Sequence, residues 1–547
     1  MPLRAASFST CRNTSSGCVA ADCADDLAAP SGAGTDQSCN FRYFNPCGRR
    51  DVSLKNFGIG DARLAEDIRK ETNIIVHMAA TVNFAERYDT ALAINTMGVK
   101  HMIDFASKCT NLELVLLVST AYVNLMKQGI MMEKPLQQWR SYDGRSDLDI
   151  SEEMAFKDEK LKELVYNNAS ERTIRHTMKK IGAQRAKKFG WANAYVFTKA
   201  MGEMLAYEQN SRLPIVIIRP SATTSTWKEP FPGWIEGAKA IDTWITNYGK
   251  GTLKFFPTDV ATVIDIVPAD IVVNAMLCII SYHPQGTADF IYQIGSSMSN
   301  PIKLGQMSQT TYKYFSQIPF VGAKGDVVKV KQPNFLATMA SFYETMDKHY
   351  KMPLQDMLRR GLSTTEDRHI YNHLKREYDF TVAVAEVYWP FTISKTRFDD
   401  SKMQNLMGMV TERDRELIPC NIKFINWDKY FMETHIPGDQ QQLLGKQSHG
   451  DGVQIWSSKA LPWLCLGAME VELAGPAAAY RRGKTMEVGM GSPGFHTDVP
   501  PSAASTPAMG EEAGCCEREG NGEFVTEGEH GRGAKLWHAW EGDCGRG

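Results

Sequence analysis

Short apolar runs alternate with amphipathic stretches through the middle of the chain. Residues 73–78 (NIIVHM), 112–118 (LELVLLV) and 214–218 (PIVII) are mostly aliphatic, and their lengths fit strands that are buried on both faces. Residues 85–109 and most of 183–208 are predicted to be helical. Strands that alternate with helices predict βαβ units, and therefore an α/β fold with a Rossmann-like parallel sheet and flanking helices.

The remaining segments of the middle differ from this sheet region in composition. Residues 130–183 are highly charged, which predicts an exposed helical insertion with a solvated face. Residues 301–438 are predicted to form a smaller, mainly helical domain, and we interpret the aromatic residues in 386–391 and 424–431 as core. The domain that contains the sheet then spans residues 51–300.

The two ends of the chain carry no sustained apolar periodicity. Residues 1–50 are rich in Arg, Ser, Thr, Ala and Cys and have no acidic residue before Asp22, so we expect a disordered leader, an aberrant N-terminus or an organelle transit peptide. Residues 439–547 are rich in Gly, Ala, Pro and Ser, and we expect a disordered low-complexity tail.

Charge and cysteine usage narrow the functional classes. The 547 residues carry a net charge of -2, which argues against nucleic acid as a partner. No apolar run approaches the roughly 18–20 residues of a membrane-spanning helix, so membrane contact is expected to be peripheral at most. Only Cys109, Cys278 and Cys420 lie in the long middle segment, which favours a reducing compartment. We expect the cytoplasm or the surface of the endoplasmic reticulum, with a plastid as the alternative from the Arg- and Ser-rich start.

One predicted helix carries a phenol and an ammonium one turn apart. Tyr195 and Lys199 are four residues apart and share a helix face. A free phenol has a pKa of about 10, and a neighbouring cation is expected to lower it, so the pair is a candidate general acid for a carbonyl oxygen. The same spacing recurs at Tyr371 and at Tyr480, where a solvated helix face is the simpler interpretation.

The sequence around Tyr195 separates it from these repeats. A predicted strand follows its helix, and the strand before the helix ends in the hydroxyls of Ser119 and Thr120. The carboxyl ends of parallel strands form the edge at which open α/β sheets bind ligands. We therefore predict a site that contains Ser119, Thr120, Tyr195 and Lys199.

Other chemical motifs do not fit their surroundings. The one full G-x-G-x-x-G, at Gly489, Gly491 and Gly494, lies in the tail and is followed by prolines that cannot open a helix. His369 and His373 share a helix face, but the glutamate of a zinc-protease motif is absent, so we predict no metal site.

Taken together, several middle segments resemble the alcohol-forming fatty acyl-CoA reductases of the plant, male-sterility branch, which are extended short-chain dehydrogenase/reductases. The segments that carry the resemblance are residues 77–89 (HMAATVNFAERYD), 118–124 (VSTAYVN), 194–203 (AYVFTKAMGE), 217–237 (IIRPSATTSTWKEPFPGWIEG), 265–275 (DIVPADIVVNA), 386–391 (EVYWPF) and 425–438 (INWDKYFMETHIPG).

The resemblance implies roles for the matching residues. Tyr195 would be the proton donor, and Lys199 would lower its pKa and bind the nicotinamide ribose. Thr120, or Ser119 beside it, would hydrogen-bond the substrate oxygen, and Asn95 would support the proton relay beside the cofactor. Further cofactor contacts are implied at Asp51, Ala79, Ala80, Arg219, Pro220 and Ser221.

The implied reaction is the reduction of a long-chain fatty acyl-CoA by NADPH to a primary alcohol, with release of CoA. Members of the family open with a glycine-rich turn after their first strand, and residues 1–50 contain nothing like it. We therefore expect the first βαβ unit to be missing, a sheet edge to be unpaired, and NADPH to bind weakly. The alternatives are a catalytically impaired relic, or a gene-model fragment, that keeps the fold and binds acyl chains, and another extended reductase such as a sugar epimerase.

Overall fold

A computed structural model describes residues 5–8, 51–236, 240–284, 290–322 and 325–440. Within these ranges a parallel sheet has the strand order β1-β2-β3-β5-β10. The predicted Rossmann-like sheet is thereby confirmed, whereas the predictions for residues 9–50 and 441–547 lie outside the described residues. Its strands are β1 (Ala5–Phe8), β2 (Ile74–His77), β3 (Leu114–Val118), β5 (Ile215–Pro220) and β10 (Ile291–Ile294).

Strand β1 pairs with the edge of β2 that we expected to be unpaired. The register aligns Ala5 with Ile74 and Phe8 with His77, and the strands run parallel. That expectation is wrong because strand pairing uses backbone groups, so a short segment without a long apolar run can supply it.

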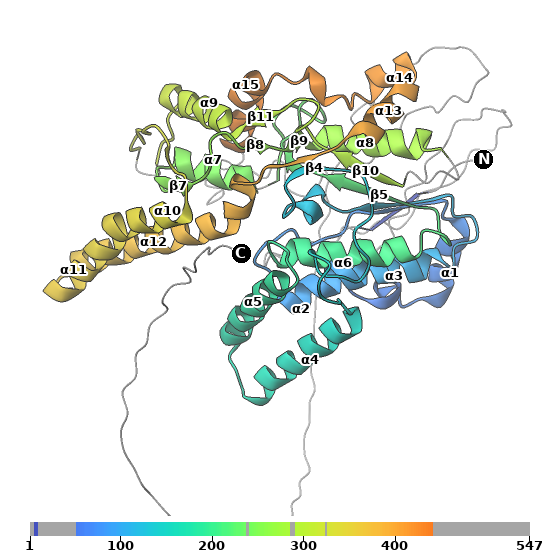
Figure 1. Cartoon of the computed structure of the whole chain (residues 1–547), viewed down its shortest axis with the longest axis horizontal. Helices are drawn as coiled ribbons and strands as arrows, with labels where there is room; N and C mark the ends of the chain where they lie inside the picture. Colours follow the sequence, from blue (N-terminus) through green and yellow to red (C-terminus); the bar gives the residue numbers. More distant parts are fainter. Residues whose placement is uncertain (1–4, 9–50, 237–239, 285–289, 323–324, 441–547) are drawn as a thin grey trace, which may run out of the picture. The chain divides into compact units, whose positions relative to one another are not determined.

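Helices cover both faces of the sheet. Successive strand residues point to opposite sides, so an aliphatic strand presents apolar side chains to both faces. Ile74 belongs to the core beneath α8 (Ala269–Tyr282), whereas Ile75 belongs to the core beneath α1 (Ala62–Glu71) and α3 (Met97–Ala106). Helix α6 (Ala194–Glu208) lies on the same face as α1 and α3 (Figure 1). Both faces are therefore buried, as the aliphatic runs predicted.

The helix predicted over residues 85–109 is observed with one widened turn. It consists of α2 (Tyr88–Ala91), the π-helical turn η2 (Leu92–Thr96) and α3. Such turns are often found at functional sites.

The segment 183–208 forms two helices rather than one. Helix α5 (Glu171–Lys188) ends before Gly190, whose φ of +83° is a backbone conformation that favours glycine. Helix α6 then begins at an N-cap, because the side chain of Asn193 accepts a hydrogen bond from the backbone amide of Val196 at 3.0 Å. Tyr195 consequently lies in the first turn of α6.

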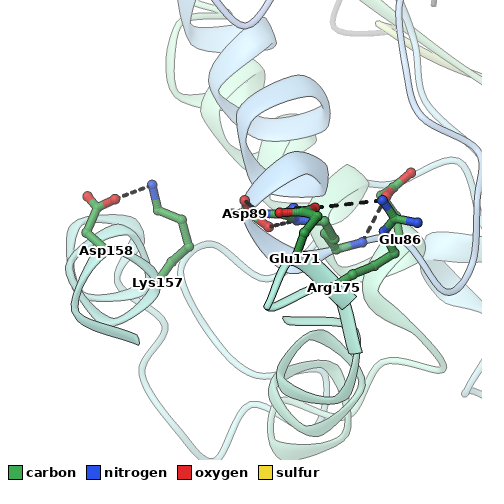
Figure 2. A network of polar contacts seen from close by, with 7 residues as sticks. Glu86, Asp89, Lys157, Asp158, Glu171 and Arg175 are labelled. Carbon is green, nitrogen blue, oxygen red and sulfur yellow. Dashed lines mark hydrogen bonds and ion pairs between the residues drawn. The ribbon is translucent and has the colours of Figure 1, made fainter. Parts of the chain in front are cut away.

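The charged insertion contains α4 (Ile150–Tyr166) and α5, and one face of it is packed. Met178 and Ile181 of α5 join a core with Phe197 of α6 on the packed side, whereas many other positions of the two helices are exposed, as the predicted solvated face requires. Outside this core the carboxylate of Glu171 pairs with Arg87 at 2.8 Å. Figure 2 shows Glu171 close to Asp89 and Arg175.

The region after residue 300 is mainly helical, as predicted, and its small strands pair with strands from before that position. The strand β12 (Asn334–Leu336) pairs with β7 (Phe255–Pro257), and β13 (Thr396–Phe398) pairs with β4 (Gly129–Met131). The other strands are β6 (Ala222–Thr224), β8 (Val263–Ile264), β9 (Ile266–Pro268) and β11 (Ile302–Lys303), and the other helices are α7 (Ile241–Gly249), α9 (Leu304–Gln317), α10 (Met339–Met346), α11 (Met352–Arg360), α12 (Thr365–Thr392), α13 (Ser401–Met409), α14 (Glu412–Leu417) and α15 (Trp427–Tyr430).

One apolar core joins these late helices to the sheet. It includes Ile218 of β5, Ile271 of α8, Leu406 of α13 and Trp427 of α15. In the described ranges no helix is both long enough and apolar enough to cross a bilayer.

A buried polar cluster attaches the end of the described chain to the sheet domain. The imidazole of His435 lies 2.9 Å from the hydroxyl of Ser225 through Nδ1 and 3.0 Å from the carboxylate of Asp242 through Nε2. The Tyr430 hydroxyl donates to the backbone carbonyl of Ser225 at 2.6 Å. All of these side chains are buried, so water cannot replace one that is removed.

We predict that His435→Ala lowers the free energy of unfolding by about 1–3 kcal/mol, because it removes the buried contacts of the imidazole with Ser225 and Asp242 and leaves a cavity. The measurement is urea unfolding followed by fluorescence. The matched control is His373→Ala, which removes an exposed histidine 3.5 Å from Glu377 on α12 and should cost less than about 1 kcal/mol. Equal losses in the two variants would contradict the assigned role of the cluster.

Candidate active site

The carboxyl end of β3 brings three of the predicted site residues together. The carbonyl oxygen of Val118 accepts a hydrogen bond from the ammonium of Lys199, with Nζ and O 2.6 Å apart. Two residues later, the hydroxyl of Thr120 lies close enough to the phenol of Tyr195 to lower its pKa, and it also accepts a hydrogen bond from the backbone amide of Tyr122 at 3.3 Å. Thr120, Tyr195 and Lys199 therefore share one site at the edge where sequence analysis placed them.

Ser119, between these two positions, contacts a different residue of α6. Its hydroxyl donates to the carboxylate of Glu203 at 2.7 Å. The guanidinium of Arg219 donates to the same carboxylate from Nε at 3.1 Å, and both charged groups are buried. Arg219, for which a cofactor contact was implied, lies inside β5 with its guanidinium bound to Glu203. Of the two hydroxyls considered for the substrate oxygen, Thr120 is the one that reaches Tyr195.

Burial has the largest effect on the pKa values of Tyr195 and Lys199. It raises the pKa of Tyr195 to about 12, and the hydrogen bond from Thr120 acts in the opposite direction. It lowers the pKa of Lys199 to about 8, against the negative charge of Glu203. Lys199, whose ammonium is bound to the carbonyl of Val118, is not among the causes of the Tyr195 shift, so the lowering of the Tyr195 pKa by Lys199 remains a prediction.

Asn95 fixes the loop after β2 to helix α6. From the π-helical turn its Oδ1 accepts from the backbone amide of Thr81 at 2.9 Å, and its Nδ2 donates to the Thr198 hydroxyl at 3.1 Å. The side chain is buried. These contacts position backbone segments around the site, and a contact of Asn95 with the cofactor remains a prediction.

Helix α6 approaches this turn so closely that one position accepts only glycine. A Cβ added at Gly202 would lie 2.5 Å from the carbonyl oxygen of Asn95 and 3.1 Å from Cγ2 of Val99. The first distance is too short for any side chain, and the contacted atom is backbone. Gly202 therefore sets the distance between α6 and the turn that carries Asn95.

The remaining predicted cofactor residues lie at or near the sheet. Ala79 and Ala80 follow β2 and are buried and half-buried, respectively; Pro220 ends β5, and Ser221 follows it. These four lie within three residues of the carboxyl end of a strand. Asp51 is exposed and precedes α1, where its carboxylate accepts a backbone hydrogen bond at 2.8 Å. Their contacts with a cofactor remain predictions.

His77, the last residue of β2, was not among the predicted site residues. Its ring is buried, and neither ring nitrogen has a hydrogen-bond partner among the described residues. Burial and the charge of Lys199 lower its pKa to about 3, so the imidazole is neutral near pH 7. A polar residue in the otherwise aliphatic run NIIVHM was the available signal.

The edge around His77 fits the nicotinamide and ribose end of a dinucleotide. It combines a phenol, an ammonium and a ring with unpartnered nitrogens, and the small side chains of Ala79 and Ala80 allow close approach to the backbone. In the part of the chain that the structure describes, no glycine-rich turn joins a strand to a helix N-terminus.

An apolar pocket adjoins Tyr195. The space between its walls, which includes open solvent, is about 830 Å³. The ring of Phe84 separates the pocket from the phenol, since its centroid lies 5.6 Å from Tyr195 and 5.2 Å from Phe391. Other lining residues come from distant segments and include Tyr122, Ala222, Trp244, Met307 and Tyr388.

The aromatic residues in 386–391 contribute to both the core and the pocket. Tyr388 packs against the core, as predicted, and Tyr388 and Phe391 also line the pocket. The lining residues lie far apart in the sequence, so no local pattern marks them as a group.

The parallel sheet, the phenol and ammonium on α6, and the hydroxyl of Thr120 define a nicotinamide-dependent reductase of the short-chain dehydrogenase type. Comparison with protein families then gives the particular family. Residues 47–276 match the NAD-binding domain described as "Male sterility protein", and residues 349–446 match a second domain with the same description.

Curated relatives agree with this assignment over most of the chain. Fatty acyl-CoA reductase 1 of Arabidopsis thaliana is 42% identical over 393 residues, which cover 71% of this chain and 80% of the relative. The alcohol-forming fatty acyl-CoA reductase of Simmondsia chinensis is 36% identical over 399 residues, or 72% and 81% of the two chains. The chain therefore belongs to the fatty acyl-CoA reductase family. Among solved structures, the terminal R domain from the myxalamid pathway aligns with a TM-score of 0.41 and 13% identity, over 74% of this chain and 76% of its own.

We predict that Gly202→Ala destabilises the protein by roughly 1–3 kcal/mol, because the added methyl group forces α6 away from η2. Thermal unfolding measures the loss. Gly408→Ala is the matched control: it also replaces a helical glycine, in α13, but its added Cβ would have no atom within 4 Å. That control should be neutral or stabilising by up to about 1 kcal/mol, and a neutral Gly202→Ala would contradict the close packing.

Proposed function

We propose that this protein reduces long-chain fatty acyl-CoA to a primary fatty alcohol with NADPH as the reductant and CoA as the leaving group. The observation that carries the proposal is the apolar pocket that begins at Phe84, next to Tyr195. An acyl chain in this pocket would place its thioester near the phenol. Family membership supports the acyl-CoA substrate through the names of the relatives.

The residues of this chain would act on the carbonyl oxygen. Tyr195 would donate a proton to it in each of the two reduction steps, and Thr120 would orient the phenol beside it. Lys199 would supply the positive charge that favours phenolate once its ammonium faces the phenol. Two molecules of reduced nicotinamide, bound in turn, would each supply one hydride to the carbonyl carbon, the first for the thioester and the second for the aldehyde. Between the two steps CoA would leave as the thiol and take the proton that the oxygen had received.

The specificity of the reaction would come from the pocket. Its walls are mainly aliphatic and aromatic, so they favour an acyl chain over a sugar nucleotide, whose hydroxyls would need polar partners. This argues against an epimerase-like activity. An acyl-binding protein without turnover is the second candidate, because the described residues lack a glycine-rich turn that would hold the pyrophosphate.

The direct test incubates the purified full chain with long-chain or medium-chain acyl-CoA and with NADPH or NADH. Mass spectrometry then measures the fatty alcohol that is formed. Formation of alcohol from the long-chain substrate with NADPH is the expected result. Tight acyl-CoA binding without any alcohol would favour the second candidate, and a preference for NADH would overturn the choice of cofactor.

We predict that Tyr195→Phe lowers alcohol formation roughly 10²–10⁴-fold, the usual contribution of general acid catalysis. The thermal midpoint should change little, because the variant loses one hydroxyl group and little volume. Tyr371→Phe is the matched control, since Tyr371 lies on α12 and repeats the spacing to a lysine. Retention of most activity by Tyr195→Phe would show that another group protonates the substrate.

We predict that Ala222→Phe shortens the accepted acyl chain, because the added ring occupies part of the pocket. If it displaces about two methylene groups, at about 0.8 kcal/mol each, kcat/KM for long chains falls roughly tenfold. Medium chains should be affected less. The control is Ala155→Phe at an exposed position of α4, and an equal effect on both chain lengths would argue against the pocket as the acyl site.

A further inference from the structure

The carboxylate of Glu203 lies one helical turn beyond Lys199 and is 2% exposed. It accepts hydrogen bonds from Ser119 at 2.7 Å and from Nε of Arg219 at 3.1 and 3.2 Å, and it also accepts from the Nη2 of the same guanidinium. The carboxylate thus connects β3, α6 and β5 at a single point below the candidate site.

Its bonds belong to a regular series. Three consecutive residues, the last of β3 and the two that follow it, face α6: Val118 binds Lys199, Ser119 binds Glu203, and Thr120 lies near Tyr195. The Ser119 bond lies between the two contacts that involve the proposed reaction groups. A change in the Ser119 contact would therefore move both of its neighbours.

We propose that Glu203 is a positioning residue, which holds Thr120 against Tyr195 through Ser119 and keeps the Lys199 ammonium charged. The assignment rests on the proposed function for the roles of Tyr195 and Lys199. The geometry itself, a buried carboxylate between two strand ends and the reaction helix, is independent of the substrate.

Stability alone gives little reason for this buried ion pair. Replacement of such a pair by apolar side chains of similar volume is often neutral or stabilising, because the pair is costly to remove from water. Arg219 is fully buried, so its pairing with Glu203 avoids an isolated charge rather than adding a large favourable contribution. The Glu203–Arg219 pair is better explained by its effect on the positions and charges of Ser119 and Lys199.

The groups around Lys199 define the direction of the electrostatic effect. Glu203 lies on the same helix, His77 lies on β2, and Arg219 lies on β5. The ring of His77 is neutral near pH 7, since its pKa is lowered to about 3. Burial lowers the pKa of Lys199 and the charge of Glu203 raises it, so the removal of that charge must lower the pKa of Lys199 further.

The experiment measures the ionisation of Lys199 in the full chain without substrate. Acetic anhydride labels the neutral amine, and mass spectrometry gives the labelling of Lys199 as a function of pH. In Glu203→Gln the labelling midpoint should fall by roughly one pH unit or more. Because no reduction is needed, this result is separate from success or failure of the proposed function.

A second variant covers the case in which Glu203→Gln fails to fold with an unpaired Arg219. The double variant Glu203→Met and Arg219→Met replaces both charges with apolar side chains of similar length and should fold. It should show a smaller downward shift, because the Arg219 charge that opposes the effect of Glu203 is removed as well, together with faster hydrogen exchange at the amides of residues 119–124. In an active preparation the alkaline limb of the kcat/KM profile should move to lower pH in parallel.

The matched control is Glu153→Gln, which breaks another buried carboxylate and arginine pair, with Arg185, between α4 and α5. It should lower the thermal midpoint without moving the Lys199 labelling curve. The proposal is overturned if the folded double variant keeps the labelling midpoint and hydrogen exchange of the parent, or if Glu153→Gln shifts the Lys199 curve equally.

Discussion

The attachment of helix α6 to the end of β3 is the constraint on which the site depends. Two buried hydrogen bonds, from Lys199 to the carbonyl of Val118 and from Ser119 to Glu203, join the end of β3 to α6, and Thr120 follows next to Tyr195. The backbone contact at Gly202 fixes how close the helix lies, and the bonds fix its position along the strand. Neither set of contacts alone would place Tyr195 beside Thr120. The packing of α6 therefore determines where the proposed reaction groups lie.

The sheet could be predicted from sequence because its strands are buried on both faces and therefore read as aliphatic runs. The observed β2, β3 and β5 lie within two residues of the predicted bounds. Strand β1 could not be predicted, because its pairing depends on backbone groups that a residue pattern does not reveal. The break between α5 and α6 was missed although Gly190 and Asn193 marked it, since the apolar pattern on both sides outweighed two local signals.

For the site, the spacing of Tyr195 and Lys199 and the position of Thr120 were sufficient to predict which residues meet. The spacing did not predict the bonds, because the partner of a long side chain depends on what the fold brings near it. The Lys199 ammonium reaches a backbone carbonyl, and Arg219 reaches Glu203, both through tertiary contacts. The pocket was missed for the same reason, since Phe84, Trp244 and Phe391 are adjacent only after folding.

The position of this pocket has a consequence for turnover. Its walls come from segments before and after residue 300, which share one core. A bound acyl chain would extend that core, so the folded state would gain about 2.7 kcal/mol when the ligand is present at a hundred times its Kd. A fatty alcohol would be retained by the same forces, and unlike CoA it has no large polar group to draw it into water. Release of the fatty alcohol, rather than hydride transfer, would then be the rate-limiting step.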